Sequence, residues 1–95
     1  MPTYVMLSTL SEQGLKTLQA NPERLLEVNR DVEELGAKVL HQWFMLGQYD
    51  FLNILEAPDA GTVARVSIAL GARGSVHTQS FEAIGVEHFL DLLRG

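Results

Sequence analysis

The chain has 95 residues, of which 46% are hydrophobic and 20% charged, a balance that excludes intrinsic disorder and predicts one domain over residues 1–95. Twelve acidic residues against seven basic ones give a net charge of −5, which argues against binding to nucleic acid or to a membrane surface. The absence of cysteine removes thiol nucleophiles, thiolate metal sites and disulfides. Because the first residues lack a basic segment and a long apolar run, we expect a cytoplasmic location.

The first third of the chain predicts one strand and two helices. Residues 3–9 are mostly apolar and compatible with a β-strand. Residues 11–19 are expected to form a short helix capped by the serine at its start. Asn21 and Pro22 are typical of the N-cap and first position of a second helix, which Gly36 would end.

The remaining chain predicts a hairpin, a helix, a strand and a terminal helix. Residues 37–45 and 50–56 are apolar-rich runs joined by a short segment with one glycine, so they are expected to pair as antiparallel strands. Asp59 is a suitable N-cap for the helix that follows. The last three elements are predicted at residues 59–71, 75–81 and 87–94.

This order of elements predicts an α+β fold of the ferredoxin-like type. A βαββαβ arrangement gives a four-stranded antiparallel sheet with helices on one face, and here a short C-terminal helix is added. The other face stays uncovered, yet every predicted strand carries at least one aromatic residue: Tyr4, Trp43, Phe44, Phe51 and Phe81. One helical layer covers only part of this set, so we expect a homo-oligomer, most simply a dimer, joined through the uncovered face.

The segment Leu46-Gly47-Gln48-Tyr49-Asp50 resembles the turn that gives the GYD-domain family its name. Similar agreement covers Glu56-Ala57-Pro58-Asp59, the stretch 69–78 and the opening Tyr4-Val5-Met6-Leu7-Ser8. The resemblance implies a dimeric α+β barrel, in which open sheet faces pack across subunits. It implies no particular chemistry.

The Tyr49–Asp50 pair has two interpretations. It could form a hydrogen-bonding pair at the rim of a pocket, with tyrosine as a donor or weak acid. Alternatively, Gly47 supplies a turn with positive φ, Asp50 accepts hydrogen bonds from backbone amides, and Tyr49 folds over the end of the hairpin.

Metal and anion sites receive little support. His41, His77 and His88 show no local ligand spacing, so no metal, haem or other cofactor is expected, apart from a site shared across a symmetry axis. Arg73 lies in a loop bracketed by Gly71 and Gly74, where it would bind either an anion or a neighbouring carboxylate.

The side chains that face the uncovered surface depend on the strand register, which the sequence leaves open. In one phase Tyr4, Met6, Gln42, Phe44, Phe51, Asn53 and His77 share a face; in the other His41 and Trp43 join Leu52 and Ile54. The candidate residues for a pocket or an interface are therefore Tyr4, His41, Trp43, Tyr49, Asp50, Asn53, Arg73 and His77.

Two functions from different classes fit these patterns. The first is a homo-oligomeric interaction or ligand-binding module, whose partners are a second copy and, for ligand binding, a small molecule. The alternative is a small cofactor-free enzyme of the monooxygenase or isomerase type. There a tyrosine or histidine among Tyr4, His41, Tyr49 and His77 would transfer protons.

Overall fold

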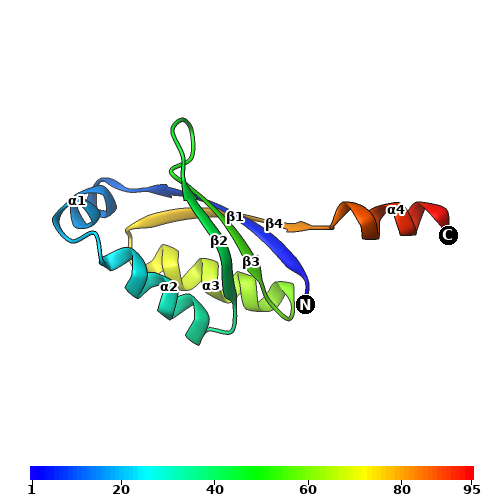
Figure 1. Cartoon of the computed structure of the whole chain (residues 1–95). Helices are drawn as coiled ribbons and strands as arrows, with labels where there is room; N and C mark the ends of the chain where they lie inside the picture. Colours follow the sequence, from blue (N-terminus) through cyan, green and yellow to red (C-terminus); the bar gives the residue numbers. More distant parts are fainter.

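A computed structural model describes residues 1–95, and its centre is a four-stranded antiparallel sheet in the order β2-β3-β1-β4. The strands are β1 (Thr3–Leu10), β2 (Lys38–Phe44), β3 (Phe51–Glu56) and β4 (Val76–Ala83). The helices α1 (Glu12–Ala20), α2 (Arg24–Glu34) and α3 (Ala60–Ala72) lie on one face of this sheet (Figure 1). The predicted ferredoxin-like α+β fold is confirmed.

Side-chain caps define the start of two helices. The Ser11 hydroxyl accepts a hydrogen bond from the Gly14 amide at 3.1 Å, and the Asp59 carboxylate accepts one from the Thr62 amide at 2.8 Å. Both caps are those predicted from the sequence. The hydrogen bond from the Thr62 amide also holds the pKa of the Asp59 carboxyl below its usual range.

The predicted start of the second helix is wrong. Helix α2 begins at Arg24, and residues 21–23 form turns in which the Arg24 amide donates to the Asn21 carbonyl at 3.1 Å. Asn21 instead closes the preceding helix, because its amide donates to the Thr17 carbonyl at 2.9 Å. With the two helices only a few residues apart, the end of α1 takes the residue that sequence reasoning assigned to the start of α2.

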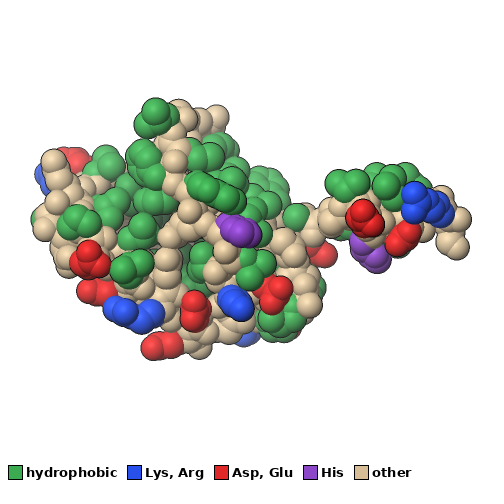
Figure 2. Space-filling view, in the orientation of Figure 1, with side chains coloured by type: hydrophobic (Ala, Val, Ile, Leu, Met, Phe, Trp, Pro, Cys, Tyr) green, Lys and Arg blue, Asp and Glu red, His purple; other side chains and the backbone are tan.

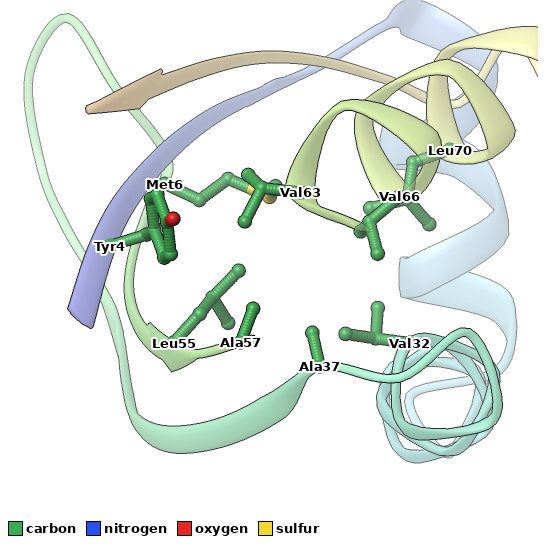
Figure 3. Packing of buried hydrophobic residues seen from close by; sticks show 9 residues of the cluster. All are labelled: Tyr4, Met6, Val32, Ala37, Leu55, Ala57, Val63, Val66 and Leu70. Atoms are coloured by element: carbon green, nitrogen blue, oxygen red, sulfur yellow. The ribbon is translucent and has the colours of Figure 1, made fainter. Parts of the chain in front are cut away.

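The hydrophobic core lies between the sheet and helices α2 and α3 (Figure 3). Only 14 of the 95 residues are buried, and Leu55 and Val66 are the largest that are fully enclosed. The core cluster consists of Tyr4, Met6, Val32, Ala37, Leu55, Ala57, Val63, Val66 and Leu70. The strand residues of this cluster, Tyr4, Met6 and Leu55, all lie on one face of the sheet.

The strand register assigns each side chain to a face. Met6 is paired with Asn53 on one side and with Ser80 on the other, so these residues share the helix-covered face. In β2 the pairing slips between Val39 and His41. This β-bulge lets Val39 face the helices while His41 faces away from them, although both have odd numbers.

Helix α4 (Val86–Arg94) stands apart from the rest of the chain (Figure 1). It follows β4 after only Ile84 and Gly85 and continues beyond the end of the sheet. None of its residues is buried. No helix of the chain, α4 included, combines the length and apolarity that a bilayer-spanning segment needs.

The close packing of α1 on the loop before β4 depends on Gly14. A Cβ atom there would collide with the carbonyl oxygen of Ser75, which also accepts the Ser11 amide at 2.9 Å. We therefore expect Gly14→Ala to lower the free energy of unfolding by about 2 kcal/mol or more. The control Gly71→Ala has open space around the new methyl group inside α3 and should raise stability by about 0.5–1 kcal/mol. Urea unfolding measures both, and equal values for the two variants would contradict the importance of this close packing.

Candidate functional site

The face of the sheet turned away from the helices, here called the open face, carries a continuous apolar surface. Its centre is half-buried and its rims carry the rings of Trp43 and Phe81, each 51% exposed. The apolar side chains of the open face are Val5, Leu7, Trp43, Leu52, Ile54 and Phe81. Figure 2 shows hydrophobic side chains gathered over this upper part of the body.

The polar side chains of the open face lie on its two edge strands and at the ends of the central strands, where Thr3, Thr9 and Glu56 are found. On β2, His41 stacks on Trp43 with ring centroids 5.4 Å apart and an interplanar angle of 11°. On β4, His77 pairs with Thr9, which places it on the open face, opposite to Tyr4 and Asn53. The grouping of His77 with those two residues is therefore wrong, because β4 residues with even numbers pair with even-numbered residues of β1. The two histidines are separated by the width of the sheet.

The hairpin between β2 and β3 is fastened to β1 by Asp50. Its carboxylate accepts a hydrogen bond from the Leu10 amide at 2.7 Å, and its own amide donates to the Ser8 carbonyl at 2.8 Å. The carboxylate thus takes the place of a strand carbonyl where the β1–β3 ladder ends. Gly47 at the tip has φ +123°, as the structural interpretation of this turn requires.

Tyr49 extends from the same hairpin toward the open face. Its hydroxyl donates to the Gln79 side-chain oxygen on β4 at 2.7 Å. The bond joins the hairpin to the far edge strand, across the end of β1. Tyr49 and Asp50 therefore fix the position of the hairpin, and they point to different partners.

Arg73 lies away from the open face. Its guanidinium forms an ion pair of 2.9 Å with Asp31 of α2, which fixes the end of α3 against α2. Of the two interpretations of this loop, binding to a neighbouring carboxylate is the one that the geometry supports. Gly74 follows with φ +76°.

A second candidate site lies on the other side of the sheet, beneath α1 and α2. A cavity of about 100 Å³ is lined mainly by aliphatic side chains, with a row of hydrogen-bonded amides along one wall. The Gln42 amide nitrogen donates to Asn53 at 2.7 Å and to Asn29 at 3.2 Å, and Asn53 donates to the Met6 carbonyl at 3.0 Å. Sequence reasoning missed Asn29 here, although an amide on the apolar side of an amphipathic helix was a usable signal.

The groups proposed for proton transfer are not brought together. Tyr4 is buried under the helices, His41 and His77 lie at opposite edges of the open face, and Tyr49 is on the hairpin. Burial raises the pKa of Tyr4, and the charges of Glu82 and Asp59 add to this effect, so its phenol is neutral near pH 7. Nowhere do three or more His, Asp or Glu side chains approach closely enough to hold a metal ion.

Comparison with known proteins identifies a family that includes the hairpin turn described above. The family model of the GYD domain matches residues 4–93. This chain belongs to the GYD domain family. The position of Asp50 shows what the family's characteristic Asp does in this GYD domain: it closes the ladder between β1 and β3.

Two proteins of Thermus thermophilus are similar to this GYD domain. One is 48% identical over 95 residues, which cover 99% of this chain and 100% of that protein, and it is named "Glutamine synthetase and cystathionine beta-lyase binding protein". The other is TTHA0845, whose crystal structure is similar with a TM-score of 0.57 and 18% identity, covering 90% of this chain and 95% of that one. At that identity, the second similarity supports the fold alone.

Variants of the GYD turn should separate the roles of its two polar residues. Asp50→Ala leaves the Leu10 amide without its partner and should lower the free energy of unfolding by about 1–3 kcal/mol. Asp50→Asn keeps an oxygen acceptor and should lose less. Tyr49→Phe removes one exposed hydrogen bond and should lose about 0.5 kcal/mol. Chemical denaturation measures all three, and an Asp50→Ala variant as stable as the natural chain would refute the structural role.

Proposed function

We propose that this GYD domain is an interaction module that binds a second copy of itself through the open face and, as a dimer, binds metabolic enzymes. The observation that carries the proposal is the apolar open face, with Trp43 and Phe81 each 51% exposed. Contiguous apolar surfaces of this kind on small proteins mark interaction sites. Aromatic rings are enriched at the residues that contribute most to binding.

A second copy is the simplest partner for the open face. The face is apolar at its centre and carries its hydrogen-bonding groups around the periphery, with His41, His77 and Gln79 on the edge strands and others at the ends of the central strands. A two-fold axis through such a surface places apolar side chains against their equivalents and leaves the polar edges in water.

Enzyme partners are suggested by the relative that is 48% identical to this chain and is named as a binding protein for glutamine synthetase and cystathionine β-lyase. Nearly all of both chains is included in that comparison. The first experiment is therefore titration of the purified protein against these two enzymes from its own organism, with sedimentation as the readout. Co-sedimentation with either enzyme supports the proposal, and separate sedimentation of both contradicts this part of it.

The cavity favours a second candidate function, the binding of a small neutral ligand. Both arginines that line it are already paired, Arg24 with Glu27 at 2.7 Å and Arg73 with Asp31 at 2.9 Å. The wall thus offers aliphatic contacts and neutral amides but no unpaired charge, and burying a charged ligand there would be costly. A compact apolar molecule with one hydrogen-bonding group fits this chemistry.

Cyclopentanol is a suitable probe of the cavity. We expect it to shift the side-chain amide NMR signals of Gln42 and Asn53 in a saturable way, because both line the cavity. Val28→Phe, which places a ring in the same space, should keep the fold and abolish the shifts. Unchanged amide signals in the natural chain would reject the cavity as a binding site.

Replacing one ring of the open face should weaken self-association. Phe81→Asp places a charge on the open face and should raise the dissociation constant of the dimer by about 30-fold or more. The matched control is Ile68→Asp on α3, where the side chain is 74% exposed and belongs to no proposed interface. Light scattering coupled to gel filtration gives the mass. Twice 10.5 kDa is expected for the natural chain and the control, and a monomeric natural chain would refute the proposal.

A further inference from the structure

The C-terminal helix α4 has a distinct apolar side and nothing in its own chain to cover it. Its exposed apolar residues are Val86, Phe89, Leu90, Leu92 and Leu93. Val86, Phe89, Leu90 and Leu93 follow the three- and four-residue spacing of one helix face. Figure 2 shows these hydrophobic side chains along one side of α4 and the acidic and histidine side chains on the other.

A helix of this length needs a surface to rest on. Helix α4 has nine residues, and isolated helices shorter than about 12–15 residues are marginal in water. No residue of α4 is buried in the single chain. Packing against another surface is therefore needed to keep α4 helical in solution.

The size of the uncovered surface matches a protein interface. A compact protein of 10.5 kDa exposes about 5,400 Å², whereas this chain exposes 6304 Å². The excess, about 900 Å², is close to the roughly 800 Å² that each partner buries in a standard interface. The radius of gyration, 14.4 Å, also exceeds the value of about 12 Å for a compact chain of this length.

We infer that α4 is an exchanged arm, which packs its apolar side onto a second copy of the chain at the β2 edge of that copy's open face. This inference rests on the proposed self-association and names the segment that completes it. Only Ile84 and Gly85 connect β4 to α4, and α4 points away from its own sheet (Figure 1). Helix α4 can therefore contact a second copy without the chain turning back on itself after β4.

Charge and shape favour the β2 edge as the docking surface. The exposed Trp43 ring lies there beside His41. Lys38 lies on the same face, directly opposite the acidic Glu56 of β3, so the apolar Trp43 ring is the main feature of this edge and Lys38 adds a positive charge at its end. On α4, Glu87 lies at the border of the apolar side next to Leu90, whereas Asp91 lies on the polar side. The β4 edge of the open face carries no lysine or arginine, so it offers no comparable partner for the Glu87 carboxylate.

The first test compares one new charge on each side of α4. Leu90→Asp places it on the apolar side and should raise the dissociation constant of the dimer by about 30-fold or more. The control His88→Asp places it on the polar side and should leave the dissociation constant within about threefold. Both positions are exposed in the single chain, so neither variant should disturb the body of the fold. Equal dissociation constants for the two variants would overturn the inference.

The second test uses the absence of cysteine to locate the arm. A spin label on His88→Cys is unique in the chain, because the natural sequence has no cysteine. Labelled chains without isotope are mixed with unlabelled ¹⁵N chains, and NMR broadening is read in the ¹⁵N chains alone. Broadening of Trp43 and neighbouring β2 signals supports an exchanged arm.

The outcomes separate this inference from the proposed function. A dimer that shows no broadening in the ¹⁵N chains overturns the exchanged arm and leaves self-association through the open face intact. A chain that stays monomeric at hundreds of micromolar overturns both. Broadening of ¹⁵N signals on the α3 side alone also overturns the inference, because it would place the arm on a different surface.

Discussion

A sheet with one layer of helices has two unequal faces, and most features of this protein follow from that constraint. Helices α1, α2 and α3 lie on one face, where α2 and α3 enclose a core of nine residues against the sheet. The opposite face presents Trp43 and Phe81 to the surroundings. Among residues 1–95, helices α1, α2 and α3 lie on the other face and α4 points away from the sheet. Burial of the open face by another molecule, as proposed above, would lower the free energy because apolar surface would leave water.

The GYD turn fits this account as a structural device beside the interaction surface. Asp50 fixes the hairpin to β1 through the Leu10 amide, and Tyr49 reaches across to Gln79 on β4. These two bonds link the hairpin to the end of the sheet that borders the open face. A turn held in this way keeps the two central strands in register, and register decides which side chains the open face presents. The motif therefore acts on the open face by positioning other residues.

The sequence predicted the fold well because local signals are strong in this chain. The caps at Ser11 and Asp59 and the glycine at the hairpin tip all act over a few residues. The faces of the strands could not be predicted, since they depend on pairing between distant segments. The bulge between Val39 and His41 and the pairing of His77 with Thr9 have no local signal. One of the two phases considered grouped Gln42 with Asn53, but their hydrogen bonds to each other and to Asn29 could not be predicted, because three distant elements meet there.

The central claim is that the open face is buried by a second copy, and Trp43 reports on it directly. It is the only tryptophan of the chain, it lies on that face, and it is 51% exposed in the single chain. Its fluorescence emission should be blue-shifted at high protein concentration and should move to longer wavelength on dilution, with a midpoint at the dissociation constant of the dimer. An emission maximum typical of exposed indole at every concentration, with no shift on dilution, would contradict the account.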